Sequence, residues 1–326
     1  MDNNISRLRV LFTVYILFYH SVDDYFLGHL DTIHPHEELE FLRGITNFVL
    51  QGFVFISGFL MARGFFCYGK YSNKFKFFID KTQRLLIPYF VGGALLCALY
   101  SVSWTEVFYG AKHLWFLLML FDVMLVAVFS FTLLKESNRL VDVSIFFILI
   151  ILSSFVHKYS DLPNLFGWQT ALSYIPAFLT GTFMVKYKFD EKLLNMRKII
   201  FYSSFYIVLI FAVSFVFMQS LPFGLFYMHL PNYALLPFLY VLFCKLFKSS
   251  AALLIRSIDK NSLGIYILHN FVGKYTLFYY VPSFVVFYDE HYVLAPICLF
   301  VWMFSAAWIV SNIMLKNKYT AMLIGA

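Results

Sequence analysis

Arg9 and His20 are the pair of residues whose types and spacing could do chemistry together. They lie eleven residues apart in an apolar stretch that predicts a helix. Eleven residues make about three turns, so both side chains would project from one face, about 16 Å apart along the axis. A guanidinium suits a phosphate, and an imidazole can accept or donate a proton near neutral pH. The spacing would therefore accommodate a phosphate-bearing donor with a long arm, the shape of a coenzyme A thioester.

A second basic cluster, Lys81 and Arg84, precedes the sequence LLIP at the predicted start of another apolar run. If this cluster lies beside Arg9, the three cations together would hold a diphosphate. A plainer interpretation stays open for the pair Arg9 and His20 and for the second basic cluster. The cations would then only fix the orientation of the helices in a membrane, and His20 would be a hydrogen-bonded packing residue.

Several other polar residues fall within or beside apolar runs, where ionisable groups are costly and therefore become functional candidates. His113 precedes the run LWFL, and His269 ends the run SLGIYILH. Asp122 and Lys274 are expected near the middle of their runs, where they could pair with each other. Ser57 lies in GFVFISGFL, either as a nucleophile or as a small residue that lets helices approach closely. Nothing in the sequence pairs Ser57 with a base, which favours the packing role.

The composition predicts that these residues lie in a membrane. Of 326 residues, 61% are hydrophobic and 13% are charged, whereas soluble domains carry about a quarter charged residues. The net charge of +7 does not indicate a nucleic-acid partner, because the cations occur in short clusters between apolar runs. The four cysteines are widely spaced, so neither a disulfide framework nor a metal site is expected.

The apolar runs predict an all-α, polytopic bundle of about ten transmembrane helices, since a bilayer core needs about 20 apolar residues per span. Basic residues are retained on the cytoplasmic side. With both termini cytoplasmic, only Arg43, Lys112 and Lys158 of the 25 Lys and Arg residues fall in outer segments, and Lys274 falls in a span. The predicted spans lie near 8–22, 45–66, 85–104, 114–134, 141–157, 171–186, 198–218, 232–247, 262–282 and 293–315.

No predicted loop is long enough to form a separate soluble domain. The longest outer segment, about 23–44, has roughly twenty residues and is acidic. We therefore expect residues 1–326 to form one membrane-embedded domain. Its chemistry would take place within the bundle or at its two mouths.

Five landmarks along nearly the whole chain resemble acyltransferase family 3, and they occur in the family's order. The basic segment departs from the family pattern, because it has Lys81 where a second Arg is usual, and Lys lacks the bidentate fork of Arg. The landmarks are the Arg9–His20 spacing, GFVFISGFL at Gly52–Leu60, FIDKTQRLLIPY at Phe78–Tyr89, HLWFL at His113–Leu117 and SLGIYILH at Ser262–His269.

The resemblance implies a membrane O-acyltransferase that moves an acyl group, commonly acetyl, from cytoplasmic acyl-CoA to a hydroxyl of a cell-surface carbohydrate. It implies that His20 is the catalytic base and that Arg9, with Lys81 and Arg84, binds the donor, with no metal. It also implies the bacterial cytoplasmic membrane as the location, membrane lipid as the surroundings and other glycan-assembly proteins as partners.

A different class of function, a flippase or exporter of lipid-linked glycans, also fits a multispanning chain without a soluble domain. An exporter would neither consume acetyl-CoA nor be stabilised by coenzyme A, which separates the two classes. A glycan polymerase is disfavoured, because it would need a large outer loop for its acceptor. The acceptor and the type of acyl group stay open.

Overall fold

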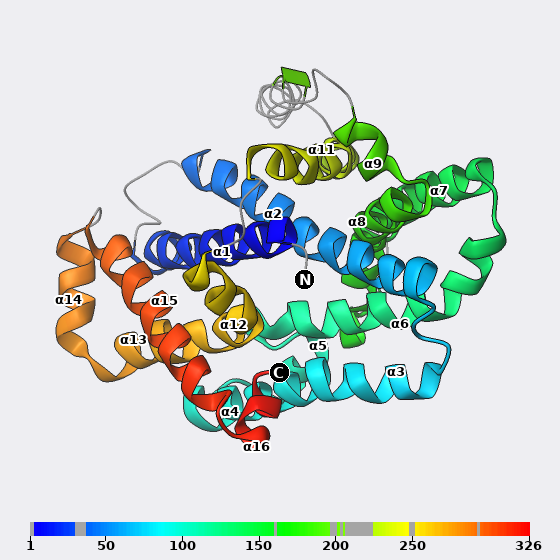
Figure 1. Cartoon of the computed structure of the whole chain (residues 1–326). Helices are drawn as coiled ribbons and strands as arrows, with labels where there is room; N and C mark the ends of the chain where they lie inside the picture. The colour runs from blue at the N-terminus through cyan, green and yellow to red at the C-terminus, as the bar shows by residue number, and fades with distance from the viewer. Residues whose placement is uncertain are drawn as a thin grey trace.

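The computed structural model describes residues 3–29, 37–159, 162–195, 201–202, 205, 224–247, 252–291 and 294–326. Across these ranges the chain is helical and contains no strand, as expected for an all-α protein (Figure 1). The elements are α1 (Asn3–His29), α2 (Glu37–Ala62), η1 (Arg63–Cys67), α3 (Lys74–Lys81), η2 (Thr82–Leu86), α4 (Ile87–Tyr100), α5 (Trp104–Tyr109), η3 (Lys112–Leu114), α6 (Trp115–Glu136), α7 (Arg139–Tyr159), η4 (Leu165–Gly167), α8 (Trp168–Lys186), α9 (Phe189–Leu194), α11 (Gly224–Leu246), α12 (Leu253–Asn270), η5 (Phe271–Tyr275), α13 (Thr276–Tyr280), α14 (Pro282–Glu290), α15 (Leu294–Met314) and α16 (Lys318–Leu323).

Five helical segments of the described chain are long and apolar enough to cross a membrane. Each overlaps a span expected from the sequence, and α1, α8 and α11 are helices where three further spans were expected. The expected span 198–218 falls mostly outside the described residues, so ten spans and cytoplasmic termini stay predictions. The five segments are Ile45–Cys67, Lys74–Tyr100, Trp104–Glu136, Arg139–Val156 and Leu294–Met314.

Large apolar side chains cover much of the surface. On α7, Leu140 is 77% exposed and Phe155 is 60% exposed, and on α15 Val301 and Trp302 also face outward. Such a surface would be costly in water and is suited to lipid. The bundle is therefore that of a membrane protein.

Helices α2 and α8 approach each other closely through two glycines. A Cβ atom on Gly58 would lie 2.1 Å from the backbone oxygen of Phe178, and one on Gly181 would lie 2.2 Å from that of Phe55. Only glycine allows two helix backbones to approach this closely. Gly58 of the run GFVFISGFL therefore serves helix packing.

Helix α1 runs through the middle of the bundle. It packs against α2 and α11 as well as against α12 and α15 (Figure 1). Its residues Leu8, Phe12 and Ile16 are almost completely buried. This central position brings the face that carries Arg9 and His20 against other helices.

A buried ion pair ties the start of α7 to the end of α8. The carboxylate of Asp142 is completely buried and pairs with the ammonium of Lys186. The hydroxyl of Tyr187 donates to the same carboxylate at 2.6 Å, and Lys186 also donates to the backbone oxygen of Ser137 at 2.9 Å. These bonds compensate for the removal of two charges from water, so the pair has a structural role.

Candidate active site

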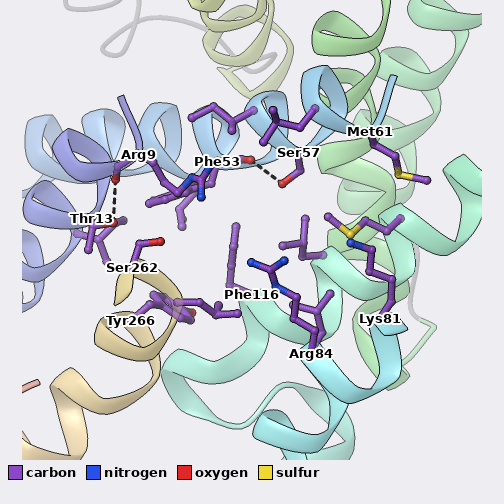
Figure 2. Close-up of a pocket in the computed structure, with 18 of the residues that line it drawn as sticks. Arg9, Thr13, Phe53, Ser57, Met61, Lys81, Arg84, Phe116, Ser262 and Tyr266 are labelled. Carbon is purple, nitrogen blue, oxygen red and sulfur yellow. Dashed lines mark hydrogen bonds between the residues drawn. The ribbon is translucent and has the colours of Figure 1, made fainter. Parts of the chain in front are cut away.

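A cavity of about 370 Å³ lies between α1, α2, η2, α6 and α12. All three cations that the sequence assigned to a donor, Arg9, Lys81 and Arg84, line it, and most of the other lining residues are apolar. Figure 2 shows Lys81 and Arg84 reaching into the cavity from the side opposite Arg9. Residues more than seventy positions apart in the sequence therefore form one basic site.

The residues of α1 that line the cavity recur at helical spacing. Arg9 is followed at four, seven and eight residues by Thr13, Ile16 and Leu17, all of which line the cavity. His20 continues this face one turn later, but it does not line the cavity. The cavity therefore ends one turn short of the imidazole.

A π-helical turn, η2, presents Arg84. It joins α3 to α4 without a break, and Pro88, near the start of α4, cannot donate a hydrogen bond to the preceding turn. Single π turns recur at functional sites. Lys81, the last residue of α3, places its ammonium 5.4 Å from the ring centre of Phe77. The two cations therefore come from a rigid helical segment.

Arg9 pairs with an acid that the sequence analysis did not single out. Its Nη1 atom lies 3.2 Å from Oδ1 of Asp259 on α12, a carboxylate that is completely buried. Neither carboxylate oxygen of Asp259 accepts a hydrogen bond of normal geometry. Among the described residues, no ion pair joins Arg84 or Lys81 to a carboxylate. The site therefore holds one compensated cation and two without an ion-pair partner.

A second cavity, of about 240 Å³, shares Arg9 and Arg84 with the first. Its lining is more polar and includes Asp259, Asn261 and Ser311. The Ser311 hydroxyl donates to the Asn261 side chain at 2.7 Å, which fixes α15 to α12. The two arginines therefore lie where a larger, mostly apolar cavity meets a smaller cavity that is lined by more polar residues.

Tyr71 is another lining residue that the sequence analysis missed. It has a positive φ of 68°, which is rare for a residue other than glycine and costs free energy. Burial raises the pKa of its hydroxyl, while the nearby charge of Arg84 acts in the opposite direction. The neutral hydroxyl can therefore donate a hydrogen bond to an anion beside Arg84.

Ser57 lines the same cavity, but its hydroxyl donates to the backbone oxygen of Phe53 at 2.9 Å (Figure 2). This is the bond that a serine makes to the preceding turn of its own helix. The hydroxyl is not directed at a base, so the geometry favours a lining and packing role for Ser57.

Three histidines meet just beyond the cavity. The ring centre of His269 on α12 lies 5.0 Å from that of His20 on α1 and 5.2 Å from that of His113 in η3. His269 is completely buried, and His113 is 6% exposed. The sequence analysis singled out each of these residues separately, and the structure brings them together.

Asp122 lies apart from this site. It is half-buried on α6 and does not line the cavity. The side chain of Lys274, its expected partner, lies outside the described residues, so the expected pair stays a prediction. No three His, Cys, Asp or Glu side chains in the described ranges are arranged to hold a metal ion.

A periodic signal could have identified Asp259. It lies ten residues before His269 on α12, close to three turns, much as Arg9 lies eleven residues before His20 on α1. Two apolar helices that each carry a charge and an imidazole about three turns apart can pair side by side. Tyr71 gave no such signal, because its place depends on a loop conformation.

A helical membrane bundle with cations around a cavity and imidazoles one turn beyond it can hold an anionic ligand with a long arm. Residues 2–312 match the family model of acyltransferase family 3, described as an acyltransferase domain. The chain therefore belongs to this family and is an acyltransferase. No curated protein and no solved structure matches the chain significantly.

Proposed function

We propose that this acyltransferase takes an acyl group, most simply acetyl, from a cytoplasmic acyl-CoA and transfers it to a hydroxyl of a surface carbohydrate. The observation that carries the proposal is the position of Arg9 and Arg84 at the junction of two unlike cavities. Coenzyme A has the matching order of parts, with a polar nucleotide, a diphosphate and a long, mostly apolar arm.

In the proposed complex, the diphosphate lies between the two arginines, whose planar guanidinium groups bind phosphate oxygens in pairs. Lys81 adds a point charge on the same side. The nucleotide occupies the smaller, more polar cavity of 240 Å³, and the arm occupies the larger cavity of 370 Å³. The arm then runs along the α1 face that leads from Arg9 toward His20.

His20 is the proposed base. It takes the proton of the acceptor hydroxyl while the hydroxyl oxygen attacks the thioester carbonyl, and a positioned base typically contributes about 10²–10⁴-fold to such a step. The carbon–sulfur bond then breaks, and the leaving thiolate takes the proton back from His20. Because the cavity ends beside Leu17 and Tyr266, these side chains must move to let the thioester reach the imidazole.

The remaining parts of the proposal follow from the predicted topology. The cations would face the cytoplasm, where acyl-CoA is made, and the histidines would lie toward the outer side, where the acceptor arrives. We place the protein in the bacterial cytoplasmic membrane, beside proteins that assemble the acceptor glycan.

The test uses the purified protein in detergent with acetyl-CoA and coenzyme A. We expect coenzyme A to raise the melting temperature and the protein to consume acetyl-CoA when the acceptor membrane fraction is present. His20→Ala should remove transfer but retain the thermal shift, whereas His291→Ala, at an exposed histidine on the surface, should change neither. A wild-type protein that ignores both compounds would contradict acyl-CoA as the donor, and transfer at the wild-type rate by His20→Ala would exclude the proposed base.

A further inference from the structure

The histidine cluster joins three segments that are distant in the sequence. His269 is its central member, because its ring packs against both His20 and His113. The contact with His113 is edge-on at 77°, and His113 is itself held by a bond from its Nε2 atom to the backbone oxygen of Ile267 at 3.1 Å. His113 therefore limits the rotation of the His269 ring.

The hydrogen bonds determine where His269 carries its proton. Its Nδ1 atom lies 2.6 Å from the backbone oxygen of Tyr266. A carbonyl oxygen can only accept, so Nδ1 must donate and carries the hydrogen. In the neutral ring, Nε2 then has a free lone pair. This atom is buried and has no hydrogen-bond partner among the residues that the structure describes, which is costly in an apolar interior.

We propose that His269 is a positioning residue for His20, an inference that rests on the proposed function. In the reacting enzyme, Nε2 of His269 accepts the N–H of His20. With His20 donating that hydrogen, its other nitrogen carries the lone pair that takes the proton of the acceptor hydroxyl, and the bond stabilises the imidazolium that forms. The role matches that of the third residue of a catalytic triad, which orients the base without being protonated itself.

The distance between the rings fits this bond. Two imidazoles joined by a nitrogen-to-nitrogen hydrogen bond of about 2.9 Å have centres about 5 Å apart. The observed separation of His20 and His269 is 5.0 Å, with the rings tilted by 37°. The separation of the two rings therefore fits this bond without movement of α1 or α12.

A neutral hydrogen-bond partner for His20 also suits the buried interior of the bundle. A carboxylate in this position would need other groups to compensate for its charge in the interior. An imidazole is uncharged between turnovers and shares positive charge only while His20 is protonated. The cluster can thus support the base without a permanent buried charge.

Two amide substitutions separate positioning from packing. The amide of His269→Asn can replace the Nδ1 donor to Tyr266 but cannot reach the position of Nε2, whereas the carbonyl of His269→Gln can reach it. Each variant is compared with the wild type for the melting temperature, the coenzyme A thermal shift, and kcat and KM for transfer of labelled acetyl from acetyl-CoA in acceptor-containing membranes.

We expect His269→Asn to lower kcat roughly 100-fold, with KM for acetyl-CoA and the thermal shift unchanged, because a positioning group acts in the transition state. His269→Gln should stay within about tenfold of the wild type. Wild-type kcat in His269→Asn, or equal losses in both variants, would overturn the inference. Failure of the wild type to consume acetyl-CoA would instead overturn the proposed function, so the two failures are distinguishable.

Discussion

The guanidinium of Arg9 lies 3.2 Å from the buried carboxylate of Asp259, and further along the same two helices His20 packs against His269. Because the two contacts follow the same chain direction in α1 and α12, the helices run parallel. One contact is a charge pair and the other an imidazole pair, about three turns apart. Two neighbouring helices thus position both ends of the proposed reaction path.

Replacing Arg84 should weaken donor binding more than it slows the chemical step. A hydrogen bond to a charged group contributes about 1.5–3 kcal/mol, so Arg84→Ala should raise KM for acyl-CoA roughly 10- to 100-fold, with a small change in kcat. Arg84→Lys retains the charge without the planar fork, so its KM should lie between those of the wild type and Arg84→Ala. Steady-state kinetics on the three proteins would measure this.

The matched control for Arg84 is Lys76→Ala, which removes an exposed cation on α3 that does not line the cavity. Its KM should equal that of the wild type. Equal effects at both positions would mean that Arg84 contributes only general positive charge.

The Arg9–Asp259 pair should show coupled effects on stability. Breaking a buried ion pair leaves one charge uncompensated and costs about 3–5 kcal/mol, and we expect the lower value because the Arg9 side chain is 17% exposed. Arg9→Gln and Asp259→Asn should each lower the melting temperature, and the double variant should lose less than their combined effect. Additive losses would show that the two groups do not interact.

Ser57 offers a test of cavity filling against nucleophilic catalysis. Because its hydroxyl bonds to Phe53 rather than to a base, Ser57→Ala should retain nearly all transfer activity. Ser57→Trp should fill the cavity and abolish both transfer and the coenzyme A thermal shift. A complete loss of transfer in Ser57→Ala, with the thermal shift intact, would instead favour a covalent acyl-serine.

The α2–α8 contact should not tolerate larger side chains. Gly58→Val and Gly181→Val would each place a Cβ atom within 2.2 Å of a backbone oxygen, so the helices must separate. We expect loss of the monodisperse peak in size-exclusion chromatography. Leu133→Ala, at an exposed position on α6, should elute as the wild type does, and normal elution of either glycine variant would contradict the close contact.

The predicted topology can be checked by labelling single cysteines after the four native cysteines have been replaced. Lys70 and Leu162 are both exposed, and the predicted spans place them on opposite sides of the membrane. A membrane-impermeant maleimide should label Leu162→Cys in intact cells and Lys70→Cys only after permeabilisation. Labelling of both from outside would require a different number of spans.

The sequence by itself determined the class of protein, its helical fold and most of the candidate residues. Hydrophobic composition and run length decide whether a chain enters a membrane, and family landmarks are read directly from the chain. The stripe from Arg9 to His20 also needs only helical periodicity. These features depend on residues that are close in sequence.

The tertiary structure decided which candidates meet. Lys81 and Arg84 reach Arg9 only because α3 and η2 pack across the cavity from α1, and the three histidines meet only because η3 and α12 pack at the same end. The pairing of Arg9 with Asp259 depends on the parallel packing of α1 and α12. Contacts between distant segments depend on side-chain packing across the whole bundle, which no local pattern specifies.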